Sequence, residues 1–266
     1  MDTKPSVHST SESMQDVDRL SCEKAAARLD VSPEVHVDDF IFRFCYENPV
    51  FPTKESAINY YFDESANSAK KVRRHIDRWM GKRDRPLNIL EFASGYGAVT
   101  RHAKKELEPH SLTSCDIHPQ AIEFLSKYFH VKILQSQVSP EALDFTEKYD
   151  VIFVLSFFSH MPRETWLRWL SRLYSALASG GIMLFTTHGK VSLQSAPQAV
   201  PDEEGYWFSP MSEQSDLETS DYGATITLKK FVDARIALLQ ESDYLYYEQA
   251  GWWSHQDVYI IRKEGL

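Results

Sequence analysis

Residues 89–103 read ILEFASGYGAVTRHA, and they join an apolar run to a turn of small residues and then to a helical pattern. Asn88–Phe92 predicts a strand, and residues 98–107 predict a helix with its apolar side chains on one side. Between them, Gly95 and Gly97 allow positive φ angles and a close approach of the backbone to a ligand. The free N–H groups at the start of the helix can bind a carboxylate or a phosphate. The segment therefore predicts a ligand-binding turn between a strand and a helix.

Strand and helix patterns alternate along the chain on the C-terminal side of this turn. Such alternation is typical of an α/β fold, in which helices cover both faces of a parallel sheet. The chain ends in two strand-like runs, which predict a closing hairpin. The predicted strands are 88–92, 111–116, 131–135, 149–156, 182–187, 244–248 and 257–262, and the predicted helices between them include 119–129 and 163–178.

Asp116 ends the second predicted strand, about 20 residues after Gly97, which is the spacing of an acid that binds ribose hydroxyls. In an open parallel sheet, ligands bind beyond the carboxyl ends of the strands. The turn and Asp116 together therefore predict a cofactor that contains adenosine. The competing interpretation is a purely structural turn with an acid that caps a loop.

The segment from Glu91 to Gly97, EFASGYG, resembles the E/D-x-G-x-G-x-G motif of class I S-adenosylmethionine-dependent methyltransferases, with Ala93 in place of the first glycine. A dinucleotide fingerprint would need a third glycine where Thr100 stands. The resemblance begins near Tyr61 and extends to the C-terminus through CDIHPQAIEFL, YDVIFVLSFFSHMP and WLRWLSRLYSALASGGIMLFTTHG. It implies a Rossmann-like, doubly wound seven-stranded sheet whose last strand is antiparallel.

The resemblance also implies which residues contact S-adenosyl-L-methionine. Those at the first turn would line its methionine portion, Asp116 would hold the ribose, and Ile117 would pack on the adenine. Gln137 stands where the family often has an acid that binds the adenine amino group. The implied cofactor residues are Glu91, Ala93, Ser94, Gly95, Gly97, Asp116, Ile117, Gln137, Ser156 and Phe157. Tyr60 or Tyr61 can close over the cofactor from the N-terminal side.

Three histidines follow predicted strands at the edge where the site would open. His160 follows the fourth strand, His188 follows the fifth, and His255 lies between the last two. A histidine can act as a general base if the methyl acceptor is a hydroxyl group. Each is also readily explained as an ordinary loop residue. We rank His160 first, His188 second and His255 third as catalytic candidates, and Asp257 can either orient an imidazole or begin the last strand.

Residues 190–223 interrupt the alternating pattern and predict a substrate lid, because long irregular segments in a domain are often functional. Aromatic residues in and near this lid predict a substrate-binding wall. The candidates are Trp207, Tyr222, Trp252 and Trp253. No HxxxH, HExxH or carboxylate cluster suggests a metal site, so a metal-assisted mechanism is disfavoured.

The formal net charge of −9 over 266 residues disfavours a nucleic-acid or membrane-surface partner. Three cysteines without CxxC spacing favour a reducing compartment, and no signal-peptide or membrane-span pattern is present, so we expect a cytoplasmic protein. We expect a largely disordered tail over 1–36 with a short helix near 22–29, a helical cap over 37–84 and a methyltransferase domain over 85–266. The oligomeric state stays open between a monomer and a homodimer.

These observations predict a methyltransferase that acts on a small organic molecule, with an oxygen acceptor favoured over a nitrogen acceptor. Two alternatives remain from the sequence alone. One is a nicotinamide-dependent oxidoreductase on a similar sheet. The other is a non-catalytic scaffold that keeps the methyltransferase fold, for which Ala93 and Gln137 are the departures that matter. The acceptor itself cannot be named from the sequence.

Overall fold

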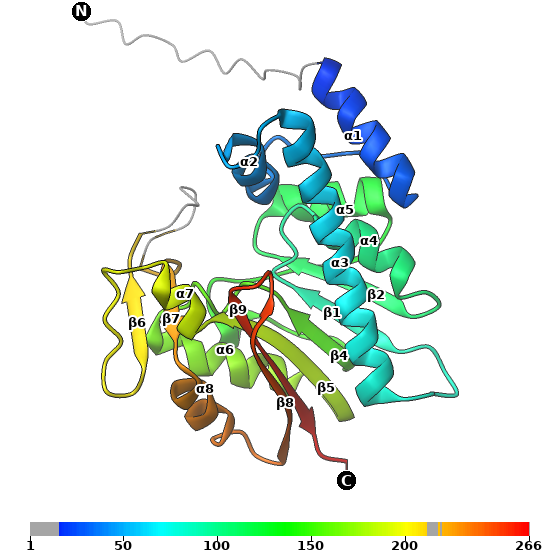
Figure 1. Cartoon of the computed structure of the whole chain (residues 1–266). Helices are drawn as coiled ribbons and strands as arrows, with labels where there is room; N and C mark the ends of the chain where they lie inside the picture. The colour runs from blue at the N-terminus through cyan, green and yellow to red at the C-terminus, as the bar shows by residue number, and fades with distance from the viewer. Residues whose placement is uncertain (1–15, 212–217, 219, 266) are drawn as a thin grey trace, which may run out of the picture.

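A seven-stranded sheet forms the centre of the molecule, and helices cover both of its faces (Figure 1). The computed structural model describes residues 16–211, 218 and 220–265. The strands lie in the order β3-β2-β1-β4-β5-β9-β8. Their bounds are β1 Asn88–Phe92, β2 Ser111–Asp116, β3 Lys132–Gln135, β4 Tyr149–Val154, β5 Leu177–His188, β8 Ser242–Trp252 and β9 Gln256–Lys263.

Strands β3, β2, β1, β4 and β5 are parallel, whereas β9 runs antiparallel to both of its neighbours, β5 and β8. In the register, Glu91 of β1 lies beside Ser114 of β2 and Phe153 of β4. This confirms the predicted Rossmann-like seven-stranded sheet with an antiparallel last strand. As a result, the carboxyl ends of the five parallel strands lie along one edge.

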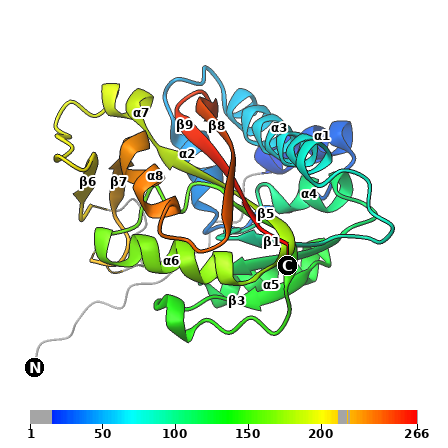
Figure 2. The ribbon, with the colours of Figure 1, turned by 90° about the horizontal axis from the view of Figure 1, so that it is seen from below.

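Alternate residues of each strand pack into different cores, as the two-residue period of a strand requires. Ile89 and Leu184 pack with α3 and α4 on one face, whereas Leu90 and Phe185 pack with α6 and α8 on the other (Figure 2). None of the helices in the described part of the chain is both long and apolar enough to span a bilayer. The helix bounds are α3 Lys54–Met80, α4 Thr100–Glu106, α5 Pro119–Phe129, α6 Arg163–Ser175 and α8 Lys229–Ile236.

The N-terminal region differs in part from its prediction. A largely disordered tail with a short helix near 22–29 was expected over 1–36; helix α1 spans Asp16–Leu29, so it includes that helix but begins earlier, and only residues 1–15 of the range lie outside the described residues. Cys22, Ala25 and Ala26 are buried against α3. Because these side chains are small and their neighbours are charged, the apolar stripe is narrow and the composition conceals it. Helix α2, Phe40–Glu47, follows within the predicted cap.

Strand β5 begins earlier than the sequence predicts. The pair Gly180-Gly181 was expected to end a helix at about residue 178, with the strand starting at Ile182. Instead α6 ends at Ser175, and β5 already begins at Leu177 and continues through both glycines. The register with β4 shifts between Tyr149 and Val151, which accommodates this irregular start.

The predicted lid, 190–223, is only partly irregular. It contains helix α7, Lys190–Gln194, and strand β6, Tyr206–Ser209, which pairs antiparallel with β7, Ala224–Thr227. Residues 212–217 and 219 of the lid lie outside the described residues. The β6–β7 hairpin lies at the side of the sheet away from α1 and α3 (Figure 1).

Candidate functional site

Four strand ends bring the predicted site residues to one edge of the sheet. The turn 94–97 follows β1, Asp116 ends β2, Ser156 follows β4, and His188 ends β5. These strands are neighbours and parallel, so their carboxyl ends lie together. The structure therefore places the predicted cofactor residues and the predicted histidines along the same edge.

The glycine turn and Asp116 are joined directly. The N–H of Gly95 donates to Oδ2 of Asp116 over 2.7 Å. The other carboxylate oxygen, Oδ1, accepts from the backbone N–H of His118 at 3.0 Å and lies 2.9 Å from His118 Nδ1. Oδ1 is therefore saturated, whereas Oδ2 keeps one lone pair. A bidentate grip on two hydroxyl groups would require the His118 ring to turn away.

Two non-glycine residues adopt left-handed backbone conformations at this edge. Ala93 after β1 and Ser156 after β4 each have a φ angle of 59°. Such conformations cost on the order of 1–3 kcal/mol and persist where the surroundings enforce them, often at functional sites. The backbone N–H of Ser94 donates to Cys115 O at 3.0 Å, and the N–H of Ser156 donates to Thr186 Oγ1 at 2.8 Å.

The two glycines of the turn have different roles. A Cβ at Gly97 would lie 2.4 Å from Phe129 and 2.5 Å from Leu125, so this glycine allows α5 to pack against the turn. A Cβ at Gly95 would meet no atom within 4 Å. Gly95, which has a φ angle of 55°, therefore borders open room at the turn.

Glu91 is turned into the protein rather than toward this room. Its Oε2 accepts hydrogen bonds from Thr100 Oγ1 at 2.6 Å and Ser114 Oγ at 3.0 Å. Burial raises the pKa of Glu91 to about 7, against the opposing effect of these two hydroxyls, and nearby Asp116 raises it further. In this arrangement Glu91 ties the start of α4 to β1 and β2.

The adenine-side candidates are only partly brought together. Ile117 is half-buried directly after β2, but Gln137 is exposed. Instead, Gln135 at the end of β3 donates from Nε2 to the carbonyl of Ile117 at 2.5 Å. The sequence analysis missed Gln135, although its place at the end of the third predicted strand was a usable signal. Phe157 packs edge-to-face on Phe92, with ring centroids 5.0 Å apart.

Helices of the cap are anchored to the glycine turn by a buried network. Arg101 of α4 is 4% exposed and donates to the Tyr61 hydroxyl at 3.0 Å and to the Ser32 carbonyl at 3.1 Å. The Tyr61 hydroxyl donates to Asp39 Oδ2 at 2.6 Å. Burial is the main cause that raises the pKa of Asp39. Tyr61 therefore holds the cap in place, whereas Tyr60 is 44% exposed.

A ring stack also connects the N-terminal segment to the turn. The ring of His36 lies parallel to that of Tyr96 at a centroid distance of 4.3 Å and an angle of 11°. Phe124 of α5 meets the His36 ring edge-on at 5.3 Å. His36, which the sequence analysis assigned to a disordered tail, thus covers the turn residue that lies between the two glycines.

The three candidate histidines lie together at the carboxyl edge of the sheet, where the proposed site would open, and we call this place the mouth. Ring centroids are 6.2 Å apart for His160 and His188, and 5.7 Å apart for His188 and His255. The sequence placed each of them after a different strand, and the parallel arrangement of β4 and β5 with the β8–β9 loop brings them into one row.

His160 has one ring nitrogen committed. Its Nδ1 lies 2.7 Å from the carbonyl oxygen of Gly223, and since a carbonyl only accepts, Nδ1 carries the proton. Tyr222 stacks on the ring at 4.4 Å and 8°. Burial lowers the pKa of His160 to about 4, although the Gly223 carbonyl opposes this. Within the described residues nothing hydrogen-bonds to Nε2, which is left with a free lone pair.

His188 and His255 are bound differently. The Nε2 atom of His188 lies 3.3 Å from Gln256 Nε2, and the ring also bonds to the backbone of Thr225. Burial, followed by His160 and His255, lowers the pKa of His188 to about 3. His255 Nδ1 lies 2.8 Å from the carbonyl of Trp253. Since a carbonyl only accepts, Nδ1 of His255 carries the proton as well, so His160 and His255 each keep Nε2 available to accept a proton, whereas His188 does not.

One substrate-side candidate, Trp252, needs correction, and Asp257, for which the sequence left two interpretations open, takes the second of them as part of β9. Trp252 is fully buried in the core under α3, because β8 turns its side chain to the face opposite α8, so it is not part of the mouth. Asp257 does not orient an imidazole: it accepts from the Tyr247 hydroxyl at 3.1 Å and from the Ala250 N–H at 2.9 Å. Trp253 remains at the rim, with its ring centroid 6.5 Å from that of His255.

Of the two aromatic candidates in the lid, only one contacts a candidate histidine. Tyr222 stacks on His160, as described above. Trp207 lies on β6 between Tyr206 and Phe208, which pack on the core below α6, and in the part of the chain that the structure describes it stacks on no other ring. The structure therefore brings Tyr222, but not Trp207, onto a candidate catalytic residue.

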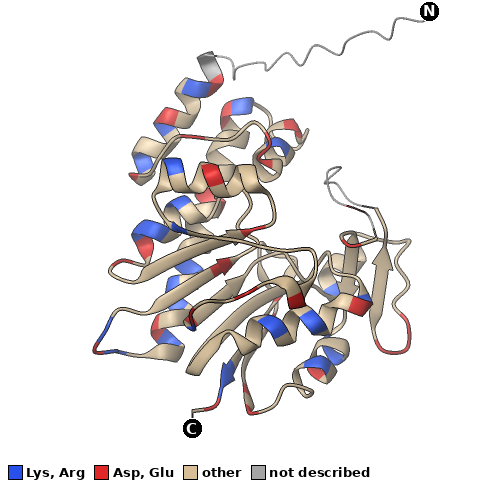
Figure 3. Cartoon of the chain, turned by 180° about the vertical axis from the view of Figure 1, so that it is seen from behind, with Lys and Arg blue, Asp and Glu red and all other residues tan. Residues whose placement is uncertain are grey.

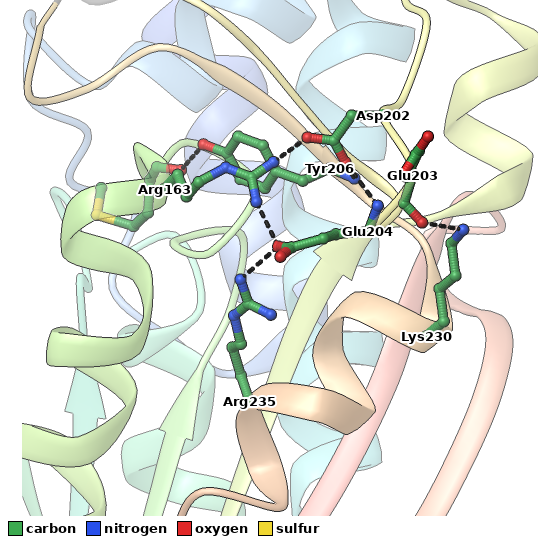
Figure 4. A network of polar contacts seen from close by, with 8 residues as sticks. Arg163, Asp202, Glu203, Glu204, Tyr206, Lys230 and Arg235 are labelled. Carbon is green, nitrogen blue, oxygen red and sulfur yellow. Dashed lines mark hydrogen bonds and ion pairs between the residues drawn. The ribbon is translucent and has the colours of Figure 1, made fainter.

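An ionic network holds the middle of the lid (Figure 4). Arg163 at the start of α6 bonds to both Asp202 and Glu204, and Arg235 of α8 bonds to Glu204 at 2.7 Å. Lys230 donates to the carbonyl of Glu203 at 2.5 Å. This network ties residues 202–204 to two helices and so fixes the middle of the lid.

Comparison with known proteins gives a consistent result. Residues 90–183 match the family model described as "Methyltransferase domain". The chain is 31% identical over 124 residues to the tRNA N(3)-methylcytidine methyltransferase trm141 of Schizosaccharomyces pombe. That match covers 42% of this chain and 49% of the relative, so the chain spans about half the length of the curated relative it matches.

Solved structures share the fold at low sequence identity. The plantazolicin methyltransferase BpumL, solved with a triazolic analogue and S-adenosylhomocysteine, superposes with a TM-score of 0.55 at 15% identity and covers 94% of this chain and 100% of its own. An S-adenosylmethionine-dependent methyltransferase from Clostridium acetobutylicum gives a TM-score of 0.53 at 11% identity, covering 77% and 92%.

Proposed function

We propose that this chain is an S-adenosylmethionine-dependent methyltransferase of a small organic molecule, because its residues 90–183 match the family model described as "Methyltransferase domain". A hydroxyl acceptor is favoured over an amine. The observation that carries this proposal is a single edge at which Gly95 bonds to Asp116 while His160 keeps a free lone pair.

The residues at the turn fit the cofactor that the fold implies. The room beside Gly95 can take the amino-acid end, and the free lone pair on Asp116 Oδ2 suits one ribose hydroxyl. Ile117 offers an apolar surface for the adenine. Ala93, Ser94, Ser156 and Phe157 complete the proposed contacts, with Glu91 acting from behind as a support. The cofactor supplies an electrophilic methyl group on a sulfonium centre.

His160 would take the proton from a hydroxyl acceptor. Its Nε2 would accept the hydroxyl proton as the methyl group passes from the sulfonium sulfur to the acceptor oxygen, which would leave S-adenosylhomocysteine and a protonated imidazole. With a pKa lowered to about 4, His160 is neutral at neutral pH and its lone pair is available. An amine with a free lone pair would not need this base, which is why a hydroxyl acceptor is favoured.

Charge distribution supports a small acceptor rather than RNA. Among residues 156–160, 186–190, 222–225 and 253–257, which surround the histidines, Lys190 is the only basic residue. The exposed cations Lys70, Arg74 and Arg78 lie in the second half of α3, the helix that leads to β1. Lys and Arg are spread over several helices and loops (Figure 3). Phosphate backbones require basic contacts near the target base.

A second candidate is a nitrogen acceptor on tRNA, since the Schizosaccharomyces pombe relative is named for that activity. The cations on α3 could bind the phosphates of a tRNA only if the tRNA extended from α3 around the sheet to the histidines. The two candidates differ in one measurable way: binding of tRNA depends steeply on salt, whereas binding of a neutral small molecule does not.

Two experiments test the proposal. Calorimetry with S-adenosylhomocysteine measures the cofactor, and NAD added in excess should leave that binding unchanged; competition by NAD would instead support an oxidoreductase. Release of S-adenosylhomocysteine is then measured with a panel of phenols, alcohols, carboxylic acids, amines and bulk tRNA. Turnover with a hydroxyl acceptor supports the proposal, turnover with tRNA alone overturns the small-molecule half, and binding without any turnover indicates a scaffold.

A reducing compartment is part of the proposal, and the cytoplasm is the one we favour. The three cysteines, Cys22, Cys45 and Cys115, form no disulfide and are buried. Burial raises the pKa of Cys22 and Cys45 to about 11, so these thiols are poorly reactive.

A further inference from the structure

Gln256, the first residue of β9, lies beside His188 at the end of β5 and is 2% exposed. Its side chain contacts three residues. Oε1 accepts from Thr186 Oγ1 at 2.6 Å, and Nε2 donates to Ser156 Oγ at 2.9 Å. The same Nε2 lies 3.3 Å from His188 Nε2. One buried amide thus links three strands at the mouth of the proposed site.

The partners of Thr186 fix the orientation of this amide. Thr186 Oγ1 accepts from the Ser156 N–H at 2.8 Å and donates its single proton to Gln256 Oε1. With the Gln256 oxygen facing Thr186, the Thr186 proton has an acceptor, which no other hydrogen bond among the described residues gives it. The two amide hydrogens then point to Ser156 and to His188, which uses the full donor capacity of the NH₂ group.

This orientation also fixes the proton of His188. Because Gln256 Nε2 can only donate, His188 Nε2 must accept and cannot carry a hydrogen. The proton of the neutral ring is then on Nδ1, from which it can be donated to the backbone of Thr225. Both nitrogens of His188 are occupied, whereas His160 has Nε2 free.

Gln256 also supports the bend that carries His160. Ser156 has a φ angle of 59°, and its Oγ receives the amide hydrogen of Gln256. Ser159 Oγ donates to the Ser156 carbonyl at 2.7 Å, and the His160 N–H donates to the Phe157 carbonyl at 3.0 Å. The strained backbone at Ser156 and the position of His160 thus depend on the same short loop.

We propose that Gln256 is a positioning residue that selects the catalytic base between His160 and His188: it occupies the lone pair of His188 and holds the bend at Ser156, so that His160 and not His188 accepts the proton. The part of this inference that makes His160 a catalytic base rests on the proposed function. The hydrogen-bond assignment can be tested without any turnover.

The titratable groups that face His188 are few. His160 comes from the loop after β4 and His255 from the loop between β8 and β9, while β7 contributes only backbone at Thr225. Asp257 is adjacent in sequence to Gln256, but its carboxylate is bonded to Tyr247 and Ala250 on the other side of β9. A carboxylate introduced at Gln256 would therefore be the only acid against His188 within the described residues.

The test compares Gln256→Glu with Gln256→Met and with the control Gln198→Glu, which introduces the same charge at an exposed position of the lid. Imidazole ¹⁵N NMR reads the tautomer and the titration of each histidine. Wild type should show His188 as the Nδ1–H tautomer. In Gln256→Glu the carboxylate should hold a proton on His188 Nε2 and move its titration above the ordinary value of about 6.5. The control should titrate as wild type.

The Gln256→Met variant tests the positioning of His160. Loss of the three amide contacts should relax the bend at Ser156 and lower kcat by roughly a hundred-fold, the scale of a misplacement of about 1 Å. Thr186→Val should have a smaller effect of the same kind, and Thr186→Ser should restore activity. Binding of S-adenosylhomocysteine reports whether each variant is folded.

Two results would overturn the inference. One is a wild-type His188 with its proton on Nε2, and the other is a Gln256→Met variant that keeps both the His188 tautomer and the wild-type kcat. If wild type binds no S-adenosylhomocysteine, the proposed function fails, whereas the NMR tautomer still decides whether Gln256 occupies the His188 lone pair.

Discussion

The two halves of the carboxyl edge are built from different chemistry. On the cofactor half, around β1 and β2, buried charged groups hold the backbone in place. Asp116 binds the N–H of Gly95, and Arg101 links the turn to Tyr61 and Asp39. On the acceptor half, around β4, β5 and β9, the fixing groups are neutral amides, hydroxyls and imidazoles.

This difference has a consequence for the base. A carboxylate next to an imidazole raises its pKa, whereas burial among neutral groups lowers it. His160 is surrounded by neutral groups and its pKa falls to about 4. The acceptor half therefore keeps a histidine neutral, while the cofactor half uses charge to hold its backbone in place.

The largest expected effect is on the acceptor half. His160→Ala should lower kcat with a hydroxyl acceptor by roughly a hundred- to ten-thousand-fold, the usual contribution of a general base. Affinity for S-adenosylhomocysteine should stay close to the wild-type value, because His160 does not contact the glycine turn. The measurement is S-adenosylhomocysteine release at saturating acceptor, with His130→Asn, an exposed histidine, as control. Equal rates in the two variants would contradict a base at His160.

The next effect is on the stability of the cofactor half. Tyr61→Phe removes the hydroxyl between Arg101 and Asp39 and leaves two buried charged groups short of a partner. The free energy of unfolding should fall by about 3 kcal/mol, as expected for unsatisfied buried groups that carry charge. Urea denaturation measures it. Tyr60→Phe, at the exposed neighbouring position, serves as the control and should change stability little.

The pH dependence sharpens the contrast between the halves. The active form of His160 is neutral, so kcat/KM should be constant from neutral pH down to about pH 4 and fall only below its pKa of about 4. A histidine with an ordinary pKa would instead lose activity below about 6.5. If kcat/KM instead reached half of its maximum near that ordinary value, the base would not be buried among neutral groups as described.

The free energy of unfolding should also fall at low pH. His160 and His188 have pKa values lowered to about 4 and about 3 in the folded chain, so the unfolded chain binds more protons between those values and the ordinary 6.5. Their contribution is complete above about pH 6.5 and is lost as the pH falls toward the folded values. Urea denaturation at several pH values, compared with His160→Gln, measures this loss; an unchanged slope in the variant would contradict it.

The smallest expected effect concerns the ionic network that holds the middle of the lid. Arg235→Gln removes one bond to Glu204, a side chain that is 55% exposed and also bonded to Arg163. Such solvent-screened pairs contribute less than about 1 kcal/mol. The unfolding free energy should therefore drop far less than in Tyr61→Phe, and the drop should shrink further in high salt. A loss as large as that of Tyr61→Phe would mean that the lid is as tightly integrated as the cap.

The sequence could predict those parts that depend on local pattern. The order of strands and helices, the turn at Gly95 and Gly97, and the acid at Asp116 all follow from residue spacing within a few dozen positions. The row of histidines could also be predicted, because parallel strands place their carboxyl ends together. The small-residue face of α1 escaped prediction, since Cys22, Ala25 and Ala26 give a weak apolar signal.

Only the tertiary structure decided which group each side chain meets. It turned Trp252 into the core and Glu91 into the strands, saturated one oxygen of Asp116 with His118, and placed Gln256 between Ser156 and His188. These contacts join residues up to a hundred positions apart. Periodicity is a local property of the chain, whereas hydrogen-bond partners and burial depend on how the strands lie beside one another, so the sequence determined the frame of the site and the packing determined its chemistry.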